Sequence, residues 1–94
     1  MTHRTDVLET ANNLITGSRE SEYGSPKLNF QNIAERWSQH VGVPIEGYQV
    51  ALMMADLKIA RMATTGQPHE DSLIDICGYA ALAAELSGEE QNDQ

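Results

Sequence analysis

The sequence predicts an all-α fold, an antiparallel four-helix bundle-like domain in which the third and fourth helices are central. Apolar residues recur at helical spacing in four segments, and glycines, prolines or capping residues separate these segments. The chain of 94 residues suffices for one domain, and its 5% aromatic content suits helices that pack through small aliphatic side chains. We therefore expect a single helical domain over residues 1–86 and a disordered acidic tail over residues 87–94.

The first two predicted helices are amphipathic. Asp6 and Glu9 have the spacing of a capping box for the first helix, which Gly17 ends. Ser25 followed by Pro26 is a common start signal for the second helix, which is expected to end at residue 40 or 41. The apolar residues of the two helices are Val7, Leu8, Ala11, Leu14 and Ile15, and Phe30, Ile33, Ala34, Trp37 and Val41.

The third and fourth predicted helices, over about residues 45–63 and 68–86, are apolar on nearly all sides. A helix of this kind lies inside a domain or between the domain and a partner. Two such helices present more apolar surface than two amphipathic helices can cover. We therefore expect a homodimer or a larger homo-oligomer that forms through the third and fourth helices.

Four charged residues interrupt these two apolar helices: Lys58, Arg61, Asp71 and Asp75. Lys58 and Arg61 are three residues apart and Asp71 and Asp75 four apart, so each pair lies on one side of its helix. The short link over residues 64–70 contains Gly and Pro and predicts an antiparallel hairpin, which would place Arg61 near Asp71 and Lys58 near Asp75.

The four charges have two interpretations. Asp71 and Asp75 have the oxygen ligands to hold Mg²⁺, while Lys58 and Arg61 could bind the phosphates of a nucleotide. Alternatively, the four side chains form a ladder of ion pairs that satisfies only its own members and has no ligand.

Three further residues are candidates for nucleotide binding. Arg19 and Tyr23, in the polar loop before Ser25, supply a cation and an aromatic ring that could stack on a base. His69, at the head of the fourth helix, could bind a metal, donate to a phosphate or carry a proton. The structural alternatives are an ordinary helix connection, in which Tyr23 folds over the core, and an exposed histidine.

Charge and composition exclude several classes of function. The 14 acidic and six basic residues give a net charge of −8, which argues against nonspecific binding to the nucleic-acid backbone, while leaving nucleic-acid mimicry as a minor alternative. The single cysteine, Cys77, excludes an intramolecular disulfide and a thiol metal cluster. The chain shows no apolar run of membrane-spanning length and no leader, so we expect a cytoplasmic protein that is not bound to a membrane.

Several motifs together resemble an uncharacterised family of small helical proteins encoded by bacteriophages and prophages. The resemblance covers roughly residues 18–86 and implies a location in the host cytoplasm. The motifs that carry it are residues 19–26, Arg-Glu-Ser-Glu-Tyr-Gly-Ser-Pro; Asn29-Phe30, Ile33-Ala34 and Trp37-Ser38; residues 57–61, Leu-Lys-Ile-Ala-Arg; and residues 69–82, His-Glu-Asp-Ser-Leu-Ile-Asp-Ile-Cys-Gly-Tyr-Ala-Ala-Leu.

That family in turn is similar to the all-α MazG-like nucleoside triphosphate pyrophosphohydrolases, which are helical oligomers that use Mg²⁺. Asp75 is similar to the final Asp of their Glu-x-x-Asp motif, but Ser72 stands where that motif has Glu, and no Glu-Glu-x-x-Glu motif occurs in the chain. The resemblance implies Asp71 and Asp75 as metal-binding and catalytic residues of an enzyme with an incomplete carboxylate motif.

Two functional hypotheses follow. In the first, Lys58, Arg61, Arg19, Tyr23 and His69 bind a nucleotide or nucleotide-derived small molecule, and a Mg²⁺-bound water attacks between the α- and β-phosphates. In the second, the chain is a small acidic interaction protein without catalysis, which blocks a host defence component or sequesters its nucleotide signal. Its exposed recognition residues would be Glu20, Glu22, Glu35 and Arg36.

Overall fold

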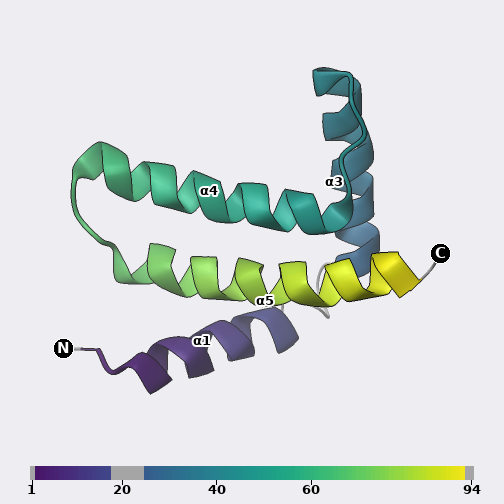
Figure 1. The fold of residues 1–94 in the computed structure, drawn as a ribbon. Coiled ribbons are helices and arrows are strands. Elements are labelled where there is room, and N and C mark those ends of the chain that lie inside the picture. The colour runs from purple at the N-terminus through teal and green to yellow at the C-terminus, as the bar shows by residue number, and fades with distance from the viewer. Residues whose placement is uncertain (1, 18–24, 93–94) are drawn as a thin grey trace.

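The computed structural model describes residues 2–17 and 25–92, which form four α-helices and no β-strand (Figure 1). The helices are α1 (Arg4–Thr16), α3 (Pro26–Val41), α4 (Gly47–Thr65) and α5 (Glu70–Asn92). The all-α class and the four helices predicted from the sequence are thereby confirmed.

An antiparallel hairpin of α4 and α5 is the centre of the fold (Figure 1). Helix α1 lies along α5 on the side away from α4, and α3 crosses the end of the hairpin where α4 begins. The central position predicted for the third and fourth helices is confirmed. Because α3 crosses the hairpin instead of running beside it, α3 covers only one end of α4.

The starts of α1 and α4 differ from prediction because other residues cap them. Helix α1 begins at Arg4, where the His3 Nδ1 atom accepts a hydrogen bond from the Thr5 N–H group at 3.2 Å, so Asp6 lies in the first turn and is not the cap. Helix α4 begins at Gly47, two residues later than predicted, and the Gln49 side chain accepts from the Glu46 N–H group at 2.8 Å. Side chains that accept hydrogen bonds from otherwise free N–H groups fix both starts.

Two glycines end helices in the left-handed conformation. Gly42 follows α3 with φ 78° and Gly66 follows α4 with φ 73°, and each donates its N–H group to the last turn of the preceding helix. A residue with a Cβ atom is strained at this φ, which explains glycine at both positions. Helix α3 has the predicted bounds, with Ser25 before it and Pro26 as its first residue.

Helix α5 runs to Asn92, past its predicted end at Leu86, so residues 87–92 are helical instead of a disordered tail. Leu86 is 1% exposed and anchors this end of α5 in the core. Gly88 has a negative φ and does not break the helix. Residues 93 and 94 of the predicted tail lie outside the described residues.

The main core lies where α3, the beginning of α4 and the end of α5 meet. It consists of Phe30, Ala34, Val50, Ala51, Ala83 and Leu86. Trp37, one of the apolar residues of the second predicted helix, packs against this cluster, and so does Tyr79. On the other side of α5, a Cβ atom at Gly78 would lie only 3.1 Å from the Cγ2 atom of Ile15, so this glycine permits the close approach of α1. The core is therefore concentrated at one end of the hairpin.

Candidate functional site

The clearest charged contact lies between α4 and α5, where Lys58 Nζ is 3.0 Å from Asp75 Oδ2. The two side chains are 17% and 24% exposed, so the pair is largely removed from solvent. The predicted register, with Lys58 opposite Asp75, is confirmed. Each charge offsets the desolvation of the other, and this pair holds the hairpin in register.

The second predicted pair does not form. Arg61 and Asp71 are both exposed, and neither has an ion-pair partner among the described residues. Both lie near the turn that joins the two helices, where water solvates each charge and an exposed ion pair gains little free energy. Asp71 is in the first turn of α5, where the positive end of the helix dipole favours a carboxylate.

These positions limit how a metal could bind. Residues 2–17 and 25–92 contain no cluster of three or more His, Cys, Asp or Glu side chains placed to hold a metal ion. Asp75 is engaged by Lys58, which leaves Asp71 as the uncommitted carboxylate of the predicted Mg²⁺ pair. The donor set is therefore weaker than the two free carboxylates expected from the sequence.

The other predicted binding residues are not part of this cluster. His69 is exposed, and its Nε2 atom lies 3.3 Å from the Thr65 Oγ1 atom, a contact that spans the turn between α4 and α5. Arg19 and Tyr23 lie outside the described residues, as do Glu20 and Glu22 of the interaction hypothesis. Glu35 and Arg36 are exposed on α3, as that hypothesis requires.

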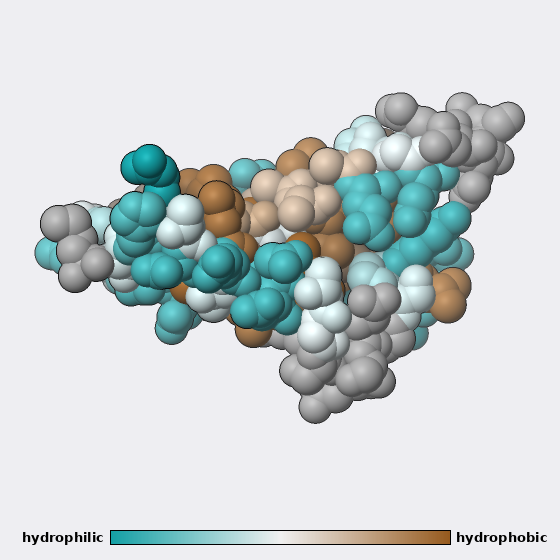
Figure 2. All heavy atoms as spheres, turned by 90° about the horizontal axis from the view of Figure 1, so that it is seen from below, coloured by the Kyte–Doolittle hydropathy of each residue, from teal (hydrophilic) through white to brown (hydrophobic). Residues whose placement is uncertain are grey.

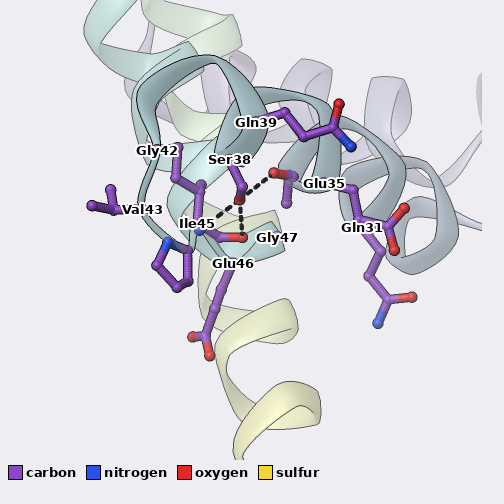
Figure 3. Close-up of a pocket in the computed structure, with 11 residues that line it drawn as sticks. Gln31, Glu35, Ser38, Gln39, Gly42, Val43, Ile45, Glu46 and Gly47 are labelled. Carbon is purple, nitrogen blue, oxygen red and sulfur yellow. Dashed lines mark hydrogen bonds between the residues drawn. The ribbon is translucent and has the colours of Figure 1, made fainter.

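An open hollow between α3 and the link to α4 was not predicted (Figure 3). At its centre the Ser38 hydroxyl donates to the Ala34 carbonyl oxygen at 2.6 Å and accepts from the Ile45 N–H group at 2.8 Å. Glu35 and Glu46 line the rim, and both are exposed. Since the Ser38 hydroxyl is occupied by the backbone, its role is to fix the link between α3 and α4.

The most unusual surface is apolar and lies on one side of the hairpin. We call it the uncovered face and define it by Leu52 and Ile59 of α4 and Leu73, Ala80 and Ala84 of α5. The exposed fractions of Leu52, Ile59 and Leu73 are 47%, 49% and 41%, and both alanines are exposed. In each helix the spacing of these residues, seven or four, places them on one side.

The Lys58–Asp75 pair shows that the two halves of this face adjoin. It defines the sides on which α4 and α5 meet, and the antiparallel direction of the helices then turns Ile59 and Leu73 to the same side of the hairpin. Figure 2, seen from the side on which α1 lies, shows a band of apolar atoms beside hydrophilic ones.

Three of the acidic residues of α5 lie away from the uncovered face. At about 100° per residue, Asp71, Asp75 and Glu89 lie roughly opposite Leu73 and Ala80 around the helix axis. A helix surface that faces water normally carries the charged residues and turns its apolar residues inward. Helix α5 instead turns Leu73, Ala80 and Ala84 to water, although the chain carries a net charge of −8.

Residues 6–87 match the family model described as a domain of unknown function, DUF6378. The chain belongs to this family. Two curated relatives are the Gene 55 proteins of Mycobacterium phage L5 and Mycobacterium phage D29, each 40% identical to the chain over 81 and 80 residues. Both matches cover 85% of this chain, and they cover 51% and 52% of the relatives, so the chain spans about half the length of these relatives.

These matches confirm the predicted resemblance to an uncharacterised, phage-encoded family. The further similarity to MazG-like pyrophosphohydrolases gains no support from them, and no solved structure matches the DUF6378 chain. Among its described residues, no helix is both long enough and apolar enough to cross a membrane.

Proposed function

We propose that this DUF6378 protein is a non-catalytic protein-binding module that acts through the uncovered face. The observation that carries this proposal is the exposure of Leu52, Ile59 and Leu73 on one side of the central hairpin. Contiguous exposed apolar surface of this kind is a common mark of a protein interaction site.

The ion pair between Lys58 and Asp75 supports a structural role for these two residues. Lys58 and Asp75 neutralise each other at 3.0 Å, so the pair needs no ligand to satisfy its charges. The bacteriophage relatives make a host protein one class of partner for this module, including a component of host defence. A second copy of the chain is another class of partner.

Site-specific photo-cross-linking in bacterial cells tests the proposal. A photoreactive amino acid at position 52 is expected to form covalent protein adducts, because that side chain would lie in the interface. The matched control is the same probe at position 12, where the exposed Asn12 lies on α1 away from the uncovered face. Equal adduct formation at both positions, or none at position 52, would contradict the proposed function.

Nucleotide binding at the charged cluster is a second candidate function. It is favoured by Arg61, which is exposed, has no ion-pair partner among the described residues and lies one turn after Lys58. Arginine binds phosphate oxygens in a planar, bidentate geometry. In this version, Asp71 and Asp75 would hold Mg²⁺ and His69, Arg19 and Tyr23 would contact the nucleotide.

A panel of nucleoside triphosphates, deoxynucleotides and cyclic dinucleotides, with and without Mg²⁺, tests this candidate by thermal shift. Nucleotide binding predicts a selective rise of the melting temperature that Arg61→Ala removes. Hydrolysis predicts in addition that Asp75→Asn abolishes pyrophosphate release. If no ligand raises the melting temperature, the charged cluster is structural and the candidate fails.

A further inference from the structure

We propose that the uncovered face is the interface of a symmetric homodimer, in which a second copy of this chain packs its own α4–α5 hairpin against it. The two hairpins together form two layers of two helices each, with Leu73 of one copy against Ala80 and Ala84 of the other. This inference deepens the protein-binding function proposed above and rests on it.

The distribution of charge selects a second copy as the partner. Two chains of net charge −8 repel each other wherever their acidic surfaces meet. The five residues of the uncovered face are uncharged, and Asp71, Asp75 and Glu89 lie roughly on the opposite side of α5. The nearest acidic residues, the exposed Asp56 and Glu70, lie at the edges of the face, about 60° around the helix axes from Ile59 and Leu73. Two copies can therefore meet on this surface with their acidic side chains at the rim of the interface and not at its centre.

The shape of the α5 part of the face is self-complementary. Leu73 and the half-buried Ile76 are bulky and lie toward the turn, whereas Ala80 and Ala84 are small and lie farther along the helix. A two-fold axis perpendicular to α5 sets the bulky end of each copy on the small end of the other. This is the requirement for an interface in which the same patch is used twice.

The whole side of the hairpin that carries the uncovered face is large enough for a dimer interface. Helix α4 has 19 residues, so it is about 28 Å long, and two helices side by side are about 20 Å wide. Because the helix surfaces are ridged, the accessible surface of this side is close to the roughly 800 Å² that each partner of a stable protein interface buries. With α1 and α3 packed elsewhere on the hairpin, this side is open to a second layer.

Sedimentation equilibrium of the purified chain tests the dimer, with two pairs of matched variants. Leu73→Glu places a charge on the uncovered face, and Leu57→Glu places the same charge at a leucine of similar exposure, 46% against 41%, on another side of the hairpin. Ala80→Glu and the exposed Ala60→Glu form the second pair.

The wild-type chain is expected to have the mass of two chains, and Leu73→Glu and Ala80→Glu the mass of one. Leu57→Glu and Ala60→Glu are expected to keep the mass of two. Far-ultraviolet circular dichroism checks that each variant keeps its helices. A wild-type chain that sediments as a monomer, or a dimer that only the Leu57 and Ala60 variants disrupt, would overturn the proposal.

Thiol cross-linking tests the orientation of the two copies. In a Cys77→Ala background, which removes the single native thiol, Leu73→Cys and Ala80→Cys are made separately. Oxidation of an equal mixture is expected to give a covalent dimer, and oxidation of either variant alone is not. Cross-linking of Leu73→Cys with itself would overturn the antiparallel arrangement.

The two experiments distinguish a failure of the homodimer from a failure of the protein-binding function. A chain that is monomeric when purified but forms adducts with a foreign protein from position 52 in cells would overturn the homodimer and retain the protein-binding module. A dimer that dissociates on Leu73→Glu, without any foreign adduct, would identify the second copy as the partner.

Discussion

The two halves of α4 have the same kind of sequence but different surroundings. In the first half, Val50 and Ala51 are fully buried beneath α3, whereas in the second half Leu57 and Ile59 are 46% and 49% exposed. Helix α3 crosses only the first half, so nothing equivalent covers the second half within the described residues. Leu52, in the first half but on roughly the opposite side of the helix from Val50, is 47% exposed, so burial along α4 depends on the side of the helix as well as on the end that α3 covers.

The largest effect is expected from truncating the buried end. Leu86→Ala should lower the free energy of unfolding by about 2–5 kcal/mol, because it removes a fully packed side chain and leaves a cavity. Leu57→Ala, at a half-exposed leucine, should change it by less than about 1 kcal/mol. Urea denaturation of both variants measures the difference. Equal losses would show that the surroundings of Leu57 are packed as tightly as the core around Leu86.

The second prediction compares the two cations of α4. Lys58→Ala should lower the free energy of unfolding by roughly 1–2 kcal/mol, because it leaves the largely buried Asp75 carboxylate without its partner. Arg61→Ala should change it by about 0.5 kcal/mol at most, since Arg61 is exposed and unpaired among the described residues. Chemical denaturation measures both. If Lys58→Ala is neutral or stabilising, the pair is not structural, and the nucleotide hypothesis gains support.

The smallest expected effects come from two glycines with opposite backbone requirements. Gly42→Ala should destabilise the chain by about 1 kcal/mol, because φ is 78° and a Cβ atom is strained there. Gly88→Ala should stabilise it by about 0.5–1 kcal/mol, since this helical glycine has open space around it. Thermal melts compare the two variants. A loss of stability on Gly88→Ala would show that the end of α5 is not helical in solution.

The sequence predicted the helices and part of their arrangement because those features depend on local signals. Ser25, Pro26 and Gly42 bound α3 as expected, and the short link between α4 and α5 gave the register that pairs Lys58 with Asp75. The crossing of α3 and the extension of α5 beyond Leu86 were not predictable, because they depend on packing between helices.

The candidate site was predicted less completely. Periodicity predicted an interface on α4 and α5, but it could not identify the side, since both helices are apolar nearly all round. The positions of Arg61 and Asp71 predicted an ion pair, but both side chains are exposed to water and do not form one. One usable signal was present in the sequence: Asp71, Asp75 and Glu89 lie roughly opposite Leu73 and Ala80, which identifies the more apolar side of α5.

The most direct test of the central claim is the concentration dependence of thermal unfolding without any ligand. If a second copy covers the uncovered face, raising the concentration from about 1 to about 100 µM should raise the melting temperature by about 5–10 °C. The Ala80→Glu variant should show no such rise. A wild-type melting temperature that is independent of concentration would contradict the account.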